Sequence, residues 1–517
     1  MNTANFLSIP AAIFAEQEIL VFGLRRLTYG DLLARVRRLA ASLRRLGVGR
    51  GDVVAALQTN SGDYIETYYA AATLGAVFLP VNYRAKPPEL EYMLSAAKTK
   101  VIFVGQRYSD LLETLLPKCP SIATVVAYDS ELPGWLRYAN LAAGEEEVED
   151  AEVEESDVSI LMYTSGTTSL PKGVLLTHGD FTAYVINTTE LADGSDRGTA
   201  LVSVPFYHIA GTAQMMTTMW SGRRLIVLPQ FEPKEWLATV ERERVTHAMV
   251  VPTMLKQIID HPELAKFDLS TLTNLSYGGA QMPLPVIRRA IERLPKTIGF
   301  VNAYGQTETT STLTILGPED HRLEGTPQEV ETKLRRLTSI GKPLPDVEFR
   351  VVDDDGKSLP PGGVGEIAIR TPRIMKGYAT ESGSAMAATL EDGWLRTRDM
   401  GWVDEDGYIY LAGRKDDMII RGGENIAPAE IESVLQSHPD VEDVAVFGLP
   451  SEEWGQIVAA AVVPKAAARL TADSLVEHCK QRLASFKKPE KILFVSELPR
   501  NPLGKVLKKD LKQEFAG

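Results

Sequence analysis

The sequence contains few cysteines, no long apolar run and no excess of positive charge. Its two cysteines, Cys119 and Cys479, lie far apart and fit no metal-ligand spacing, so we expect reduced thiols in a cytoplasmic protein. No run reaches the roughly 20 apolar residues of a membrane span, and no basic region followed by an apolar one opens the chain, so neither a spanning segment nor a secretory signal is predicted. A net charge of −13 argues against nonspecific nucleic-acid binding. Peripheral contact with a membrane stays open.

The composition is that of a folded protein with at least two domains. The chain has 517 residues, of which 44% are hydrophobic and 24% charged, too many residues for one ordinary core. Strand and helix patterns alternate, which predicts an α/β fold with parallel sheets. The expected strands are 53–57, 101–104, 123–128, 158–163, 220–228 and 245–251, and the expected helices are 28–48, 64–79 and one from 252.

The later part of the chain predicts a different arrangement of helices and strands. Residues 318–340 are charged and predict surface helix, while 347–356 and 365–370 predict a hairpin of a β subdomain. A compact α+β domain of about 100 residues is expected at the end, with helices from 427 and at 475–483 and strands at 441–448 and 456–463. The acidic segment 145–157 predicts a solvated connector.

One stretch, Tyr163 to His178, carries an unusual density of hydrogen-bond donors. Hydroxyls, two glycines and Lys172 follow a predicted buried strand, and such a loop can wrap around phosphate oxygens. A polar hairpin with one solvated lysine is the plain alternative. No Gly-x-x-x-x-Gly-Lys-Ser/Thr occurs, so this is not the phosphate loop of the common NTPases. The donors are Thr164, Ser165, Gly166, Thr167, Thr168 and Lys172.

A second polar stretch, Asn302-Ala-Tyr-Gly-Gln-Thr-Glu-Thr310, follows a Gly-Gly-Ala turn at 278–280. Tyr304 can stack on an adenine whose other face lies against Gly278, Gly279 and Ala280. Thr307 can donate to an α-phosphate, and Glu308 can hold a magnesium ion that bridges phosphates. An ordinary turn and a polar loop are the structural alternatives.

Together these stretches resemble the acyl-adenylate-forming superfamily, which includes acyl-CoA and aryl-CoA ligases, carrier-protein adenylation domains and luciferases. Three further motifs match in the same order, Asp392 to Gly401, Tyr408 to Glu432 and Leu498 to Lys508, so the resemblance covers nearly the whole chain. Two positions depart from the pattern. Ser169 stands where the family usually has Gly, and Arg398 where it commonly has Gly or Ser.

The resemblance implies a role for each matching residue. Asp399 and Arg414 would bind the ribose, Asp416 would be the pivot of a hinge at about 414–417, and Lys505 would be the catalytic lysine. Asn302, Ala303 and Gly305 would join the nucleotide site, Thr164 would join Glu308 at the metal, and Gly422 and Gly423 would lie near the thiol. His208 would place the substrate carboxylate or control thiol entry, although a lone histidine beside aromatics is more often a hydrogen-bonded core residue.

The implied architecture is a large N-terminal domain of sheets layered with helices plus a β subdomain (1–413), followed by a small mobile α+β domain (414–517). The implied reaction is ATP- and Mg²⁺-dependent acyl-CoA formation through an acyl-adenylate, with CoA as co-substrate, as in fatty acid metabolism. The alternatives are an acyl-AMP ligase that loads a separate carrier protein, and a catalytically silent nucleotide-binding protein.

The acid is the open question of the sequence. The expected pocket carries no charge that would suit an amino-acid ammonium group, which favours a medium-to-long fatty acid or an aromatic or alicyclic acid. A homodimer is expected only because symmetric assemblies are common. The segments expected to line the pocket are His208, 249–259, Tyr277 to Ala280 and Gln306 to Thr312.

Overall fold

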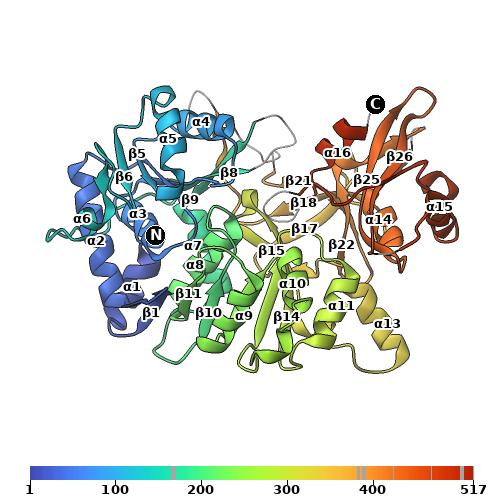
Figure 1. The fold of residues 1–517 in the computed structure, drawn as a ribbon, viewed down its shortest axis with the longest axis horizontal. Helices are drawn as coiled ribbons and strands as arrows, with labels where there is room; N and C mark the ends of the chain where they lie inside the picture. Colours follow the sequence, from blue (N-terminus) through green and yellow to red (C-terminus); the bar gives the residue numbers. More distant parts are fainter. Residues whose placement is uncertain are drawn as a thin grey trace.

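The computed structural model describes residues 1–164, 170–380, 385–386, 392–422, 424–466, 468–500 and 506–515. The chain forms two large sheets, a four-stranded sheet and a smaller carboxyl-terminal domain (Figure 1). The strands of the two large sheets alternate in blocks along the sequence. The fold class is therefore confirmed as α/β with a large N-terminal domain and a small C-terminal one. No helix in the described residues combines the length and the hydropathy that a membrane span requires.

The first large sheet has the order β16-β15-β14-β13-β12-β10-β11-β1-β2, and its pairings from β14 to β1 are all parallel. Parallel strands meet with their carboxyl ends at one edge, where ligands of α/β folds bind. The strands are β1 (Glu18–Phe22), β2 (Arg25–Thr28), β10 (Thr199–Val202), β11 (Arg224–Val227), β12 (His247–Val250), β13 (Asn274–Gly278), β14 (Gly299–Gln306), β15 (Ser311–Leu316) and β16 (Lys342–Pro343).

The second large sheet has the order β20-β19-β9-β8-β4-β3-β5-β6-β7. The antiparallel hairpin of β8 and β9 carries the predicted phosphate loop at its tip. The strands are β3 (Val53–Leu57), β4 (Val77–Pro80), β5 (Val101–Val104), β6 (Thr124–Ala127), β7 (Leu136–Arg137), β8 (Val158–Thr164), β9 (Lys172–Thr177), β19 (Gly377–Ala379) and β20 (Ala385–Met386).

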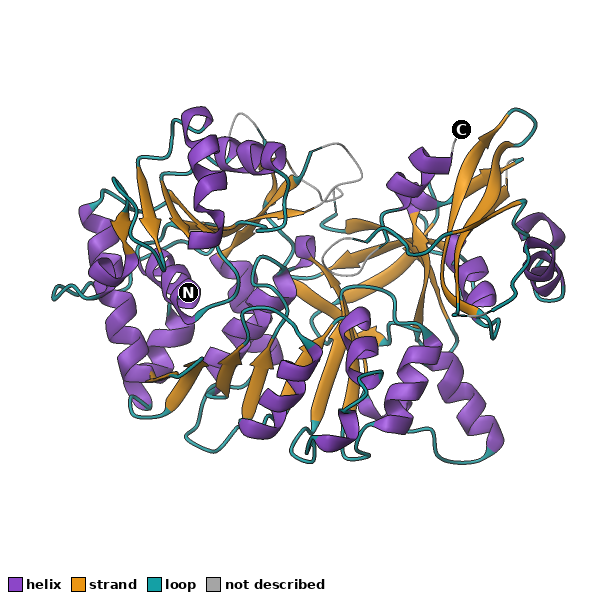
Figure 2. Ribbon diagram, in the orientation of Figure 1, coloured by secondary structure: helices purple, strands orange, loops and turns teal. Residues whose placement is uncertain are grey.

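Helices cover the faces of both sheets (Figure 2). α2 shows why the sequence forms them: Thr28 and Asp31 make a capping box, Leu32, Val36, Leu39 and Leu43 recur at helical spacing, and Arg44 and Arg45 suit the negative end of the helix dipole. The helices are α1 (Asn5–Ile13), α2 (Tyr29–Arg45), α3 (Gly62–Thr73), α4 (Pro87–Ala96), α5 (Ser109–Leu115), α6 (Tyr138–Ala142), α7 (His178–Thr188), α8 (Ile209–Ser221), α9 (Pro233–Arg242), α10 (Pro252–Ile259), α11 (Leu284–Arg293), α12 (Pro318–His321) and α13 (Pro327–Arg336).

The antiparallel β subdomain has the order β17-β18-β21-β22 and confirms the predicted hairpin. The C-terminal domain pairs two long strands antiparallel and adds a third in parallel, as an α+β unit. Its elements, with those of the β subdomain, are β17 (Glu348–Val352), β18 (Gly365–Arg370), β21 (Leu395–Val403), β22 (Ile409–Arg414), β23 (Ile419–Arg421), β24 (Glu424–Ile426), α14 (Pro428–Gln436), β25 (Val441–Ser451), β26 (Gly455–Pro464), α15 (Ala472–Lys480), β27 (Lys491–Phe494) and α16 (Lys508–Phe515).

For two predicted elements, the predicted residue range is wrong. The helix expected over 64–79 ends at Thr73, because Gly75 adopts a positive φ of 65°, and the fully buried run 77–80 is a central strand instead. The strand expected over 220–228 begins only at Arg224, because α8 continues to Ser221 and Gly222 ends it in the left-handed region. A short run of consecutive apolar residues fits a buried helix as well as a buried strand, so the hydrophobic periodicity could not distinguish the two.

Candidate active site

The predicted adenine site lies where two neighbouring parallel strands end. β13 and β14 pair so that Gly278 stands beside Ala303, which brings the Gly-Gly-Ala turn next to Tyr304. A Cβ on Gly278 would lie 2.2 Å from the Ala303 carbonyl oxygen, and one on Gly305 would lie 1.7 Å from the Ser311 carbonyl oxygen. Close backbone approach therefore requires glycine at both positions, whatever binds there.

Asp399 is the centre of a dense hydrogen-bond group. Its carboxylate accepts from the Tyr304 hydroxyl at 2.5 Å and from the Gln306 amide at 2.6 Å, while Arg414 Nε lies 2.8 Å from the other oxygen. β21 and β22 pair Asp399 directly with Arg414. Burial, followed by the charge of Asp399, raises the pKa of Tyr304 far above its usual range, so the phenol keeps its proton and donates it.

These contacts bear on the predicted ribose role of Asp399. Its side chain is only 8% exposed, and both carboxylate oxygens already have partners. Two ribose hydroxyls would therefore have to displace at least one of these partners. Gln306, which we expected in the acyl pocket, has its amide on Asp399 instead.

The hairpin of β8 and β9 brings Thr164 and Lys172 together at the base of the predicted phosphate loop. The two residues pair across the hairpin, and the Thr164 hydroxyl donates to the Lys172 carbonyl oxygen at 3.4 Å. Ser165, Gly166, Thr167 and Thr168, and the unusual Ser169, lie outside the described residues.

Glu308 lies in the short 3₁₀ helix η4 (Thr307–Thr309), directly after β14. One of its carboxylate oxygens accepts a hydrogen bond of 2.9 Å from the hydroxyl of Tyr378, and its backbone carbonyl accepts from the Met375 amide at the same distance. The ring of Tyr378 lies 5.3 Å from Lys172 Nζ. Tyr378 therefore stands between the lysine and the glutamate.

His208 is the residue immediately before α8, and its ring packs on Tyr207 at 4.4 Å between centroids. Burial lowers its pKa to about 3, with a smaller contribution from Arg84, so the imidazole is neutral at ordinary pH. Its Nε2 is buried and has no hydrogen-bond partner in the described part of the chain. A neutral ring with an unpaired nitrogen can donate to or accept from a ligand.

The predicted hinge is attached to the β subdomain by ion pairs. Arg398 Nη2 pairs with Asp416, and Lys415 pairs with Asp354 at 2.9 Å and with Glu366 at 3.1 Å. The C-terminal domain also contacts α10, where Lys256 Nζ lies 2.9 Å from Glu442 on β25.

On the predicted thiol side, Gly422 has a positive φ of 57°, and its amide donates to the Trp454 carbonyl oxygen at 2.8 Å. A Cβ at this position would lie 3.0 Å from the indole ring, so glycine also provides room for Trp454. Gly423 and the predicted catalytic Lys505 lie outside the described residues.

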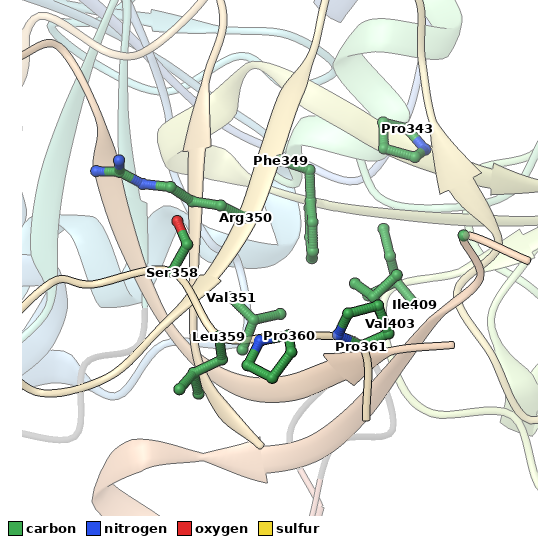
Figure 3. Close-up of a pocket in the computed structure, with 11 residues that line it drawn as sticks. Pro343, Phe349, Arg350, Val351, Ser358, Leu359, Pro360, Pro361, Val403 and Ile409 are labelled. Carbon is green, nitrogen blue, oxygen red and sulfur yellow. The ribbon is translucent and has the colours of Figure 1, made fainter. Parts of the chain in front are cut away.

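A cavity of about 320 Å³ lies within the β subdomain (Figure 3). Phe349 and Val351 of β17, Val403 of β21 and Ile409 of β22 converge on it. None of its lining residues was predicted for the active site, and its walls are mostly apolar. The convergence of Asp399, Tyr304, Glu308 and Lys172 is a better guide to the chemistry than the size of this cavity.

Comparison with known proteins agrees with the geometry. Residues 9–379 match the model of the AMP-binding enzyme family, and residues 430–505 match the C-terminal domain of AMP-binding enzymes. The chain belongs to the AMP-binding enzyme family. These matches, together with the relatives named below, confirm the predicted superfamily, the similarity to acyl-CoA synthetases and the acid–thiol ligase class.

Three similar proteins illustrate the range of this AMP-binding family. The chain is 35% identical to indoleacetate–CoA ligase of Aromatoleum aromaticum, covering 100% of this chain and 98% of that protein. It is 34% identical to a long-chain-fatty-acid–CoA ligase of Mycobacterium tuberculosis, covering 95% and 93%. The amide bond synthetase McbA from Marinactinospora thermotolerans has a similar structure, with a TM-score of 0.88, 28% identity and coverage of 99% and 100%.

The residues fit a magnesium ion that is carried by a nucleotide. No cluster of three or more histidines, cysteines or acids occurs in the described residues, so a metal cage made by the protein is absent there. Magnesium bound with nucleotides commonly takes one or two carboxylates and completes its shell with phosphates and water. Glu308, with one oxygen held by Tyr378, suits this arrangement.

Sequence reasoning missed Tyr378 and Trp454. Tyr378 lies about 70 residues after Glu308 and about 200 after Lys172, in a segment whose only local signal is a short Gly-Tyr strand. Trp454 lies in a charged turn between β25 and β26. Neither position has a spacing that points to a site, so only the fold could assign them.

Proposed function

We propose that this AMP-binding enzyme is an ATP-dependent acyl-CoA ligase. It converts a carboxylic acid and ATP to an acyl-adenylate and pyrophosphate, and then transfers the acyl group to the thiol of coenzyme A. The observation that supports it best is the convergence of Asp399, Tyr304, Glu308 and Lys172 from three separate stretches of the chain. The CoA ligases among the relatives support the same reaction class.

In the first half-reaction, a carboxylate oxygen attacks the α-phosphorus of ATP and the bond to pyrophosphate breaks. The nucleophile is already ionised, so a general base is not needed. Two anions must meet, however, and negative charge builds up at the α-phosphate. In this proposal Lys505, Thr307 and the loop that ends at Lys172 supply the compensating charge and donors, and Mg²⁺ held at Glu308 would add positive charge at the phosphates.

In the second half-reaction, the thiolate of CoA attacks the acyl carbon, a C–S bond forms, and AMP leaves with the electron pair of the broken C–O bond. Lys505 is not needed there, and its charge would stand in the thiol path. We therefore propose that the C-terminal domain turns about Asp416, which withdraws Lys505 and brings Gly422 and Gly423 to the thiol. A few hinge residues can absorb such a backbone change.

The acid in this proposal has an apolar body and no positive charge. His208, close to the expected acyl pocket, is neutral, and Met254, Leu255 and Ile258 of α10 are apolar. The relatives named above act on an indole acid and on long-chain fatty acids, so both aromatic and aliphatic acids belong in the test.

The test is a panel of fatty, aromatic and alicyclic acids, assayed for AMP and pyrophosphate with and without CoA. We expect one acid class to give pyrophosphate without CoA and acyl-CoA with it, with no added protein. Thioester formed only on an added carrier protein would favour the carrier-loading alternative. Pyrophosphate release with none of the acids would contradict the proposed function.

The proposal that Lys505 serves only the first half-reaction is tested with Lys505→Ala. Because the lysine serves only the first step, the variant should lose adenylate formation by roughly 100-fold or more, while still converting supplied acyl-adenylate and CoA to thioester at nearly the normal rate. Equal loss in both half-reactions would contradict the proposed role of Lys505. The two rates are measured separately in single-turnover assays.

A further inference from the structure

Tyr378 joins two parts of the candidate site that come from different sheets. It lies on β19, whose backbone pairs with β9 at Val174, two residues after Lys172. Its segment is also bonded to η4, through the Met375 amide and the Glu308 carbonyl oxygen. The position of Tyr378 is thus set by the backbones that carry both Lys172 and Glu308.

The hydroxyl of Tyr378 controls the orientation of the Glu308 carboxylate. A free glutamate side chain samples several rotamers, and a hydrogen bond of 2.9 Å from the phenol to one oxygen selects among them. With that oxygen engaged, the other oxygen would be the one to bind a metal ion. Groups that orient a metal ligand in this way commonly change metal affinity 10- to 100-fold when they are removed.

The ring of Tyr378 contacts Lys172. Lys172 Nζ lies 5.3 Å from the ring centroid, within the range of a cation–π interaction. This contact favours positions of the flexible lysine near the phosphate loop and depends on the ring alone. The hydroxyl and the ring therefore have separable effects.

We propose that Tyr378 is a positioning residue that sets Glu308 for the magnesium ion of Mg·ATP and Lys172 for its phosphates. This inference rests on the proposed function, because it requires that the site binds Mg·ATP. Tyr378 does not touch the reacting atoms and acts through its two neighbours. Its removal should change how the enzyme responds to magnesium before it changes the chemistry.

The experiment is calorimetric titration of ATP into the full-length protein, without acid or CoA, at a series of magnesium concentrations and in EDTA. Tyr378→Phe keeps the ring and loses the hydroxyl. For this variant, the magnesium concentration that gives half of the maximal gain in ATP affinity should rise about tenfold. Its affinity for ATP in EDTA should stay within about twofold of that of the unaltered protein. Tyr378→Leu also loses the ring and should weaken ATP binding in EDTA as well.

Tyr410→Phe is the matched control, because its hydroxyl also donates to a carboxylate, Asp404, at 3.1 Å, but in the β subdomain. It should titrate like the unaltered protein. The inference would be overturned if Tyr378→Phe lost affinity for ATP equally with magnesium and in EDTA. It would also be overturned if the affinity of the variant did not change in either condition. An unaltered protein that binds no Mg·ATP would instead contradict the proposed function on which the inference rests.

Discussion

At the scale of single residues, Arg398 combines an unfavourable backbone with a favourable contact. Its φ of 61° lies in the left-handed region, which costs a non-glycine residue about 1 kcal/mol or more. Its guanidinium pairs with Asp416, the predicted pivot, and its amide donates to Glu366. Arg398 therefore connects β21 to the predicted hinge.

Arg398→Gly should therefore separate the two effects. Glycine relieves the backbone, so the free energy of unfolding should change by less than about 1 kcal/mol. Without its arginine, Asp416 is less restrained, and trypsin should cut the native protein faster after Arg414 and Lys415. Arg398→Ala is the control: it should be cut equally fast but be less stable than Arg398→Gly, since alanine keeps the strained backbone. Equal stability of the two variants would contradict the strain argument.

At the scale of secondary-structure elements, α2 uses its arginines in two different ways. On its exposed side, Arg37, Arg38, Arg44 and Arg45 pair with glutamates of the acidic segment 145–157. This segment is mostly exposed and contains no helix or strand, as expected of a solvated connector, and the ion pairs also hold it along the helix. On its inner side, Arg35 Nε lies 2.9 Å from Glu66 of α3, which is fully buried.

The two kinds of ion pair should contribute very differently to stability. Glu66→Gln leaves the Arg35 charge without its buried partner and should cost about 3 kcal/mol. Glu146→Gln removes the partner of Arg44 and Arg45 at the surface, where water and salt screen the charges, and should have little measurable effect. Denaturant unfolding of the two variants checks this difference. A similar loss from both would contradict it.

At the scale of the whole molecule, several buried or partly buried histidines link folding to pH. Burial lowers the pKa of His208 to about 3 and of His178, His247 and His321 to about 4. In the unfolded chain these imidazoles bind protons near the ordinary histidine pKa of 6.5, so stability is lost as the pH falls from about 6.5 toward 4. Asp180 acts in the opposite direction, because burial raises its pKa to about 6.

We therefore expect the thermal midpoint to be lower at pH 5 than at pH 7. Each histidine contributes on the order of 1–2 kcal/mol over this interval, and their sum exceeds the opposing effect of Asp180. His247→Gln should reduce the difference by roughly a quarter. Scanning calorimetry at the two pH values measures it, and an equal or higher midpoint at pH 5 would contradict the account.

The sequence alone determined the α/β class, the β hairpin at 348–370, the order of the motifs and the family. These depend on local chemistry: an alternating pattern, a Gly-Gly-Ala turn and Tyr304 to Glu308 in one short stretch are readable without knowing the fold. The roles predicted for individual residues, including Asp399, Arg414, Asp416 and Lys505, stay predictions; the Lys505→Ala experiment tests one of them.

Only the tertiary structure decided which of these residues meet. Asp399 lies about 95 residues from Tyr304 and yet accepts its hydrogen bond, and Tyr378 reaches both Lys172 and Glu308 from a segment with no motif of its own. Likewise, the run 77–80 became a central strand because neighbouring strands on both sides accept its backbone hydrogen bonds. Long-range pairing of this kind depends on strand register and sheet order, which the spacing of residues along a chain does not encode.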